Sequence, residues 1–210
     1  MRTMHTAAAL LCALGLAAGS AAAQNGMNPP QGAAARGVDP LPPLTMAQGD
    51  SPEKMFTPAK IAAVATASNL DEIDPSRLAL TNSRNPAIQG FARDMVLEHT
   101  QLEAQLRDML TKKKMLEEDN ALSLQMKRNA KPTLDSLRAK QGMAFDVAYV
   151  DAMIASHDMT LKTLDTSLIP LATDPDMKTM LQNTVRPAVV RHLERAKALQ
   201  MAMLAAGRAS

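Results

Sequence analysis

The sequence predicts an all-α protein whose folded part is one four-helix bundle. Helix-favouring Ala, Leu and Met are abundant from residue 58 onward. Three helix starts are marked by a capping residue followed by proline. Apolar residues then recur at steps of three and four, which is typical of helices with one buried face. No run of residues with turn signals predicts a strand.

The first 23 residues have the features of a cleaved signal peptide. Arg2 and His5 give a short positive start, an uncharged apolar run covers residues 6–19, and small residues follow at 20–23. The apolar run is shorter than the ~20 residues that span a bilayer. We therefore expect cleavage after Ala23, no transmembrane segment after cleavage, and a protein that is periplasmic or secreted.

Charge and cysteine content exclude several classes of site. Signal cleavage removes a single charged residue, Arg2, and the mature chain keeps 22 basic and 21 acidic residues. This balance lacks the basic footprint of a nucleic-acid-binding protein. The only cysteine, Cys12, lies in the signal peptide, so the mature chain has neither a disulfide framework nor a thiolate metal site.

A disordered linker is predicted over residues 24–57, ahead of the folded domain at 58–207. The linker contains six prolines and scattered glycines. Such a composition neither continues a helix nor alternates as a strand does.

The first predicted helix covers residues 58–81. Thr57 supplies the cap, and Pro58 occupies the first helical position, where a proline is well tolerated. Asp74-Pro75 predicts a kink or a restart within this helix, because proline removes a backbone hydrogen bond.

The second predicted helix covers residues 86–114, after the cap Asn85. A long connection follows at 117–140, with two short helices expected on either side of Pro132. A connection of this length would make the second and third helices parallel, which is a ferritin-like topology.

The third and fourth helices are predicted over residues 144–168 and 175–206. Asp174 caps the fourth helix ahead of a proline, and Pro187 is expected to bend it. Four such helices bury their apolar stripes against one another.

All three histidines of the mature chain lie within apolar stripes, each on a different helix. His99 and His157 are both the fourteenth residue of their predicted helices, so parallel helices that start level would hold them at one depth. Glu72 continues the stripe of the first helix to nearly that level. His192 counts about six residues beyond it, or ~9 Å of helix rise.

One carboxylate and three imidazoles that converge in a bundle core suit a divalent transition metal. The predicted metal ligands are therefore Glu72, His99, His157 and His192. The alternative is that each histidine is a core residue bonded to a carbonyl, a carboxylate or water, because buried polar groups need partners.

Four further residues are predicted to lie near the ligands. Met95 and Met153 each precede a histidine by four residues and share its helix face. Thioether and imidazole together could hold copper, although methionine also fills gaps in a core with few aromatic residues. Asp146 and Tyr149, near the start of the third helix, could bond to each other or cap that end.

Enzyme signatures are absent from the sequence. No Glu-x-x-His pair occurs, which counts against a di-iron site. Neither a Walker loop, a Gly-x-Gly-x-x-Gly turn nor a Gly-x-Ser-x-Gly elbow is present. A metal-dependent enzyme stays a third alternative, which needs an open coordination position.

Several segments together resemble the domain of unknown function 4142 family over residues 60–199. The resemblance implies an exported ferritin-like bundle, often labelled an outer membrane protein, with no established activity. It therefore informs the fold more than the function. The segments are Glu72 ahead of Leu78-Ala79, Phe91 through His99, Phe145-Asp146 with Tyr149 and then His157, and Arg191-His192-Leu193.

The sequence thus favours an exported binding protein, envelope or stress related, with an internal histidine and glutamate site. The alternative is a non-catalytic structural or interaction module whose histidines are only structural. An envelope protein or a second copy of the chain is the expected kind of partner in either case.

Overall fold

The computed structural model describes residue 54 and residues 56–209, and these residues are almost entirely helical. The predicted signal peptide and nearly all of the predicted linker lie outside the described residues. No strand occurs in the part of the chain that is described. The helices form five rods: α2 (Pro58–Asn82); α3 (Pro86–Lys112); α4 (Ala121–Arg138); α5 (Gly142–Thr163) continued by the π-helical turn Leu164–Leu168 and α6 (Ile169–Leu171); and α7 (Pro175–Met180) continued by the π-helical turn Leu181–Val185 and α8 (Arg186–Ala209).

The three predicted capping residues begin helices as expected. The Asn85 side chain accepts a hydrogen bond from the Ala87 amide at 2.9 Å, and Asp174 accepts one from the Met177 amide at 2.9 Å. Thr57 makes a longer contact, 3.4 Å, with the Lys60 amide. These bonds satisfy amide groups that have no partner within the helix.

One expectation based on proline is wrong, because α4 is one helix through Pro132 rather than two short ones. Helix α2 also runs through Pro75 without the restart that was one of two alternatives there, and the kink stays a prediction. A proline removes one hydrogen bond of the helix, but packing along the whole helix outweighs that local loss. Helix α4 also begins with a capping box between Asn120 and Ser123, which adds stability at its start.

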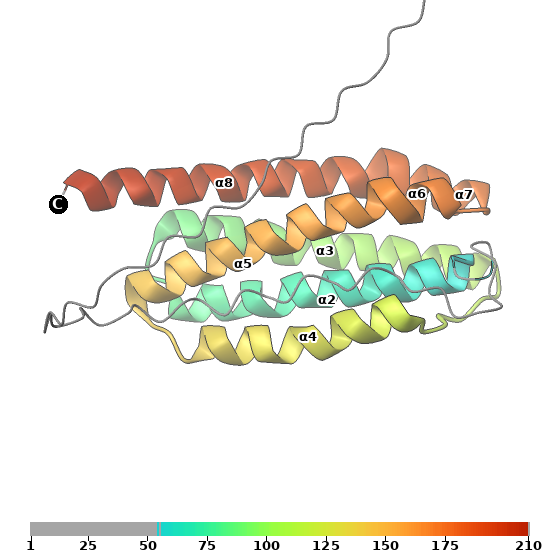
Figure 1. Ribbon diagram of the computed structural model, residues 1–210, viewed down its shortest axis with the longest axis horizontal. Helices are drawn as coiled ribbons and strands as arrows, with labels where there is room; N and C mark the ends of the chain where they lie inside the picture. The colour runs from blue at the N-terminus through green and yellow to red at the C-terminus, as the bar shows by residue number, and fades with distance from the viewer. Residues whose placement is uncertain (1–53, 55, 210) are drawn as a thin grey trace, which may run out of the picture. The chain divides into compact units, whose positions relative to one another are not determined.

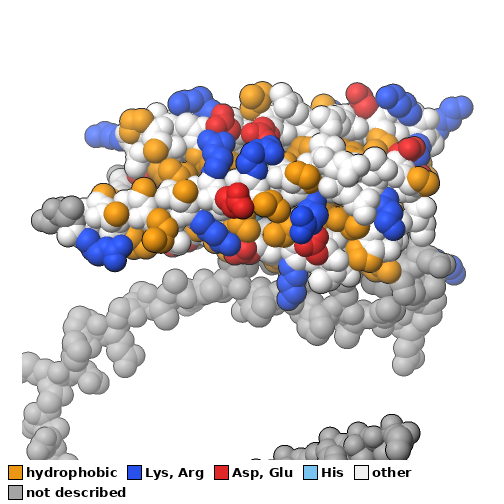
Figure 2. Space-filling view, turned by 90° about the horizontal axis from the view of Figure 1, so that it is seen from above, with side chains coloured by type: hydrophobic (Ala, Val, Ile, Leu, Met, Phe, Trp, Pro, Cys, Tyr) orange, Lys and Arg blue, Asp and Glu red, His pale blue; other side chains and the backbone are white. Residues whose placement is uncertain are grey.

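The helices are arranged so that α3 and α5 run in the same direction (Figure 1). Helix α2 packs against α3, α4 and α5, and α8 packs against α5 and α3. Helix α4 carries the chain back along the bundle before α5 begins. In the described residues, no helix has both the length and the apolar character needed to cross a membrane. Figure 2 shows basic and acidic side chains interspersed with hydrophobic ones on one face.

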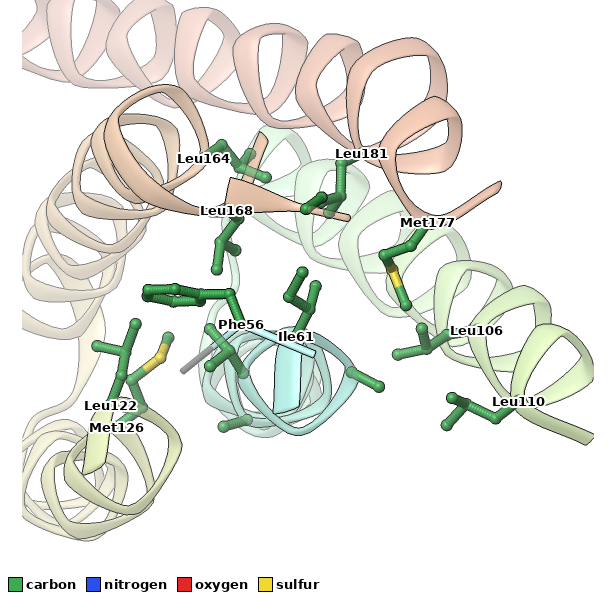
Figure 3. Packing of buried hydrophobic residues seen from close by; sticks show 14 of the residues in the cluster. Phe56, Ile61, Leu106, Leu110, Leu122, Met126, Leu164, Leu168, Met177 and Leu181 are labelled. Atoms are coloured by element: carbon green, nitrogen blue, oxygen red, sulfur yellow. The ribbon is translucent and has the colours of Figure 1, made fainter. Parts of the chain in front are cut away.

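The core consists of two apolar clusters with polar residues between them. The first cluster holds Ile61, Leu106, Leu164 and Leu181 among others (Figure 3). It also contains Phe56, a residue of the predicted linker, which is 3% exposed. The second cluster, toward the other ends of the same helices, includes Ala79, Ile88, Phe91, Met95, Phe145, Tyr149, Met153 and Ala196.

Each of α2, α3, α5 and α8 carries one predicted metal ligand between its contributions to these clusters. In α3, for example, Met95 belongs to the second cluster and Leu106 to the first, and His99 lies between them. Hydrophobic packing on both sides therefore holds the polar residues at one level.

Candidate metal centre

The four predicted ligands meet in the interior of the bundle. Glu72, His157 and His192 are 0% exposed and His99 is 2% exposed. The ring centroids are 5.9 Å apart for His99 and His157, 5.1 Å for His99 and His192, and 5.4 Å for His157 and His192. One ring nitrogen of each histidine lies within 4.8 Å of the others. We call these four residues the polar centre.

His192 reaches the level of the other histidines, although residue counting places it about 9 Å away. The count assumes that the third helix ends at residue 168. In the structure this rod continues through α6 to Leu171. The three added residues remove about 4.5 Å of the expected offset, at 1.5 Å of rise per residue.

The Glu72 carboxylate contacts two of the three histidines, His99 and His157, and its two oxygens differ. Oε1 accepts a hydrogen bond from the Ser156 hydroxyl at 2.8 Å and lies 3.4 Å from His157 Nδ1. Oε2 lies 2.9 Å from His99 Nε2, with which it forms an ion pair when that ring is protonated, and neither atom has another partner. Oε2 is therefore the oxygen that a bound ion would share with His99.

Asn69 fixes which nitrogen of His99 carries the proton. The Asn69 amide nitrogen donates to the Glu103 carboxylate at 3.0 Å, so the amide oxygen is the atom that faces His99 Nδ1, at 3.1 Å. An amide oxygen only accepts, and Nδ1 must therefore be the protonated nitrogen. In a neutral ring, Nε2 then presents its lone pair to the Glu72 carboxylate.

The other two histidines are oriented by acceptors in the same way. His157 Nδ1 donates to the backbone carbonyl of Met153 at 2.8 Å. His192 Nε2 donates to the Glu98 carboxylate at 3.1 Å, and Arg191 also pairs with this carboxylate. In the neutral rings the remaining nitrogens, His157 Nε2 and His192 Nδ1, are acceptors, and both are buried without a partner.

When the three rings are neutral, four buried electron-pair donors lack a hydrogen-bond donor: Glu72 Oε2, His99 Nε2, His157 Nε2 and His192 Nδ1. An unsatisfied buried polar atom costs about 1–3 kcal/mol. Lone pairs that face one another also repel. A shared cation would relieve both costs, because it would accept the lone pairs that face one another. The second ring N–H groups also fit a metal site, since ligating histidines commonly donate this group to a carboxylate or a carbonyl.

Burial and neighbouring charges set the protonation of two groups in the polar centre. Burial acts to raise the pKa of Glu72, but the charges of His157 and His99 and the hydrogen bonds outweigh it and lower the pKa to about 2. Burial, followed by the charge of His99, lowers the pKa of His192 to about 4. At neutral pH the chain therefore offers a carboxylate and a neutral His192 ring.

The four predicted neighbours of the ligands contribute less than expected. Tyr149 pairs with the Ser76 hydroxyl at 2.8 Å rather than with Asp146, and Asp146 Oδ1 is buried without a partner. Met95 and Met153 are buried in the second apolar cluster. Copper ligation by these thioethers stays a prediction.

Sequence reasoning missed three residues that orient the ligands: Asn69, Glu98 and Ser156. Asn69 lies three residues before Glu72 on the same helix, so helical spacing could have placed both on one face. Glu98 and Ser156 each directly precede a histidine of the polar centre. Their roles depend on contacts between helices, for which the sequence carries no signal.

Comparisons with known proteins give one result. A family model described as "Domain of unknown function (DUF4142)" matches residues 42–199. No match was found among the curated proteins or among the solved structures.

Proposed function

The chain belongs to the family described as Domain of unknown function (DUF4142), and because this description assigns no activity, we propose from the geometry that the protein binds one divalent transition metal ion at the polar centre. The observation that carries the proposal is the convergence of three buried histidine nitrogens within 4.8 Å of one another, with Glu72 Oε2 beside them at 2.9 Å from His99 Nε2. Three imidazole nitrogens and one carboxylate oxygen would be the ligands. Such a set suits zinc, copper, iron or nickel.

The residues around the polar centre support this role. His157 and His192 each donate their second ring N–H to an oxygen acceptor, and His99 donates to an amide oxygen. These bonds fix the ring orientations. In metal sites, such outer contacts, which are hydrogen bonds to the ligands from residues that do not bind the ion, have the same role. The positive charge of the ion would also be balanced by the Glu72 carboxylate, which pairs with no Lys or Arg side chain among the described residues.

The alternative, in which the histidines are only structural, has one observation in its favour. Each ring already has one hydrogen-bond partner in the protein. A structural role does not explain why the other nitrogens are left unpartnered and near one another. We therefore favour the metal site.

We further propose that the bundle is ferritin-like and that the protein is exported. The parallel course of α3 and α5 supports the topology. The charge and apolar pattern of residues 1–23 supports export. Mass spectrometry of the protein from the periplasmic fraction is expected to find Gln24 as the first residue. An intact N-terminus, or protein confined to the cytoplasm, would contradict export.

The metal proposal is tested by titration of the untagged, chelator-treated protein with zinc, cobalt and iron(II). We expect saturation at one ion per chain and a higher melting temperature for the loaded protein, because an ion that binds only the folded state stabilises it. Magnesium is the control, since it prefers oxygen ligands in octahedral geometry. Uptake of no metal, or equal effects of magnesium and zinc, would support the structural alternative instead.

A further inference from the structure

An apolar cavity of about 40 Å³ adjoins the polar centre. It extends from Glu72 and His99 into the first apolar cluster, where Leu106, Leu164 and Met177 are among the lining residues. Figure 3 shows these three side chains in that cluster, each contributed by a different part of the chain.

The two π-helical turns of the structure both border this cavity. Leu164 and Leu168 come from the first turn, and Leu181 and Val185 come from the second. Single π-helical turns are rare in proteins and are frequent at functional sites. Two of them on neighbouring rods, around one cavity, indicate a feature of the fold rather than a random packing defect.

The polarity of the cavity wall changes at one end. The hydroxyl groups of Ser68 and Thr160 lie 3.1 Å apart and satisfy each other. Among the lining residues, the buried side-chain atoms without a hydrogen-bond partner belong to Glu72 and His99. The cavity wall is therefore mostly apolar, and Glu72 and His99 of the polar centre belong to its polar end.

We propose that this cavity binds a small uncharged molecule of about two heavy atoms, of the size and polarity of dioxygen. An apolar cavity of about 150 Å³ stays dry and holds benzene, which corresponds to roughly 25 Å³ for each heavy atom. By that measure the cavity has room for a diatomic molecule. Anions are excluded because no Lys or Arg side chain lines the cavity and the Glu72 carboxylate would repel them. The further step, that the bound molecule faces the metal ion, rests on the proposed function.

The cavity itself is tested on the metal-free protein, so that the result does not depend on metal binding. Dissolved dioxygen is the probe, and line broadening of the ¹³C-labelled methionine methyl groups is the readout. Met177 lines the cavity, whereas Met95 is equally buried, at 0% exposure, in the second cluster. We expect several-fold stronger broadening at Met177 than at Met95. Equal broadening would overturn the proposal.

A pair of matched variants tests whether the broadening at Met177 comes from dioxygen inside the cavity. Val189→Ile adds one methylene to a buried residue of the cavity wall, and Val147→Ile makes the same change at a residue that is 40% exposed on α5. The first variant is expected to abolish the extra broadening at Met177, and the second to preserve it. Full broadening in Val189→Ile would overturn the proposal.

A second arm tests the step that involves the metal. Protein loaded with iron(II) is exposed to nitric oxide, another small uncharged molecule, and the iron–nitrosyl EPR signal is recorded. Val189→Ile is expected to weaken or slow this signal relative to Val147→Ile. Equal signals would contradict delivery from the cavity to the metal. If the protein takes up neither iron nor zinc nor cobalt, the proposed function fails, while the first arm still decides the cavity.

Discussion

Glu72 Oε2 lies 2.9 Å from His99 Nε2 inside the bundle, and neither atom has a hydrogen-bond partner. The Asn69 side chain holds the proton of the His99 ring on the opposite nitrogen, Nδ1. When the ring is neutral, two electron-pair donors therefore face each other in the interior of the bundle. The arrangement is stable only when a positive charge lies between them, either a proton or a metal ion.

Replacement of the carboxylate tests its role as a ligand. Glu72→Gln keeps the size of the side chain but removes the anionic oxygen that would bind the ion. We expect zinc affinity to fall by at least about 100-fold, more than the loss typical for an outer contact. Calorimetric titration measures this, with the exposed, matched variant Glu194→Gln as control. Unchanged affinity in Glu72→Gln would remove Glu72 from the ligand set.

Glu98 is expected to act through His192. Its carboxylate accepts the Nε2 proton of that ring, and Glu98→Gln weakens this acceptor. We predict a loss of about 10-fold in zinc affinity, within the range for outer contacts to metal ligands.

Asp94→Asn is the matched control for that change. Asp94 lies one turn earlier on α3 and pairs with Arg195 of α8 at 2.7 Å, but it contacts no histidine. Equal losses in the two variants would mean that the surface ion pairs, and not the orientation of His192, govern affinity.

Acid is expected to destabilise the metal-free protein through His192. Burial and then the charge of His99 lower the pKa of this ring from 6.5 to about 4 in the folded state. The unfolded chain binds the proton first, so the contribution of His192 is full above pH 6.5 and is lost as the pH falls toward 4. The expected loss is about 3 kcal/mol in the free energy of unfolding.

Denaturant unfolding of the metal-free protein between pH 7 and pH 4 measures this contribution. The variant His192→Gln has no titrating group at the position, and its stability is expected to fall less over the same range. Parallel pH profiles for the two proteins would show that other groups cause the acid sensitivity.

Sequence periodicity predicted the buried residues of the site, because a side chain at steps of three and four must share the face of its apolar neighbours. The face of α3 from Ile88 to Leu110, with His99 in its middle, is buried as predicted. The effect of Pro75 and Pro132 was not predictable, since local rules for proline do not include the packing that holds a helix together. Asn69 and Glu98 each contact a histidine on another helix. Their distances to those histidines depend on how the whole bundle packs.

Tyr149 is expected to stabilise the second apolar cluster without affecting the metal. Its hydroxyl group pairs with Ser76 at 2.8 Å, and burial, together with the charge of Glu72, raises its pKa above the ordinary value, so it stays protonated. Tyr149→Phe leaves the buried Ser76 hydroxyl without its partner, at a cost of about 1–2 kcal/mol. Denaturant unfolding measures that cost. A large fall in zinc affinity would instead connect Tyr149 to the metal site.

X-ray absorption at the zinc edge of the loaded, untagged protein identifies the atoms that bind the ion. We predict one zinc ion per chain, with nitrogen and oxygen ligands at about 2.0–2.2 Å. We also predict the outer scattering of three imidazole rings. A spectrum with only oxygen ligands, or with fewer than two imidazole rings, would contradict binding at the polar centre.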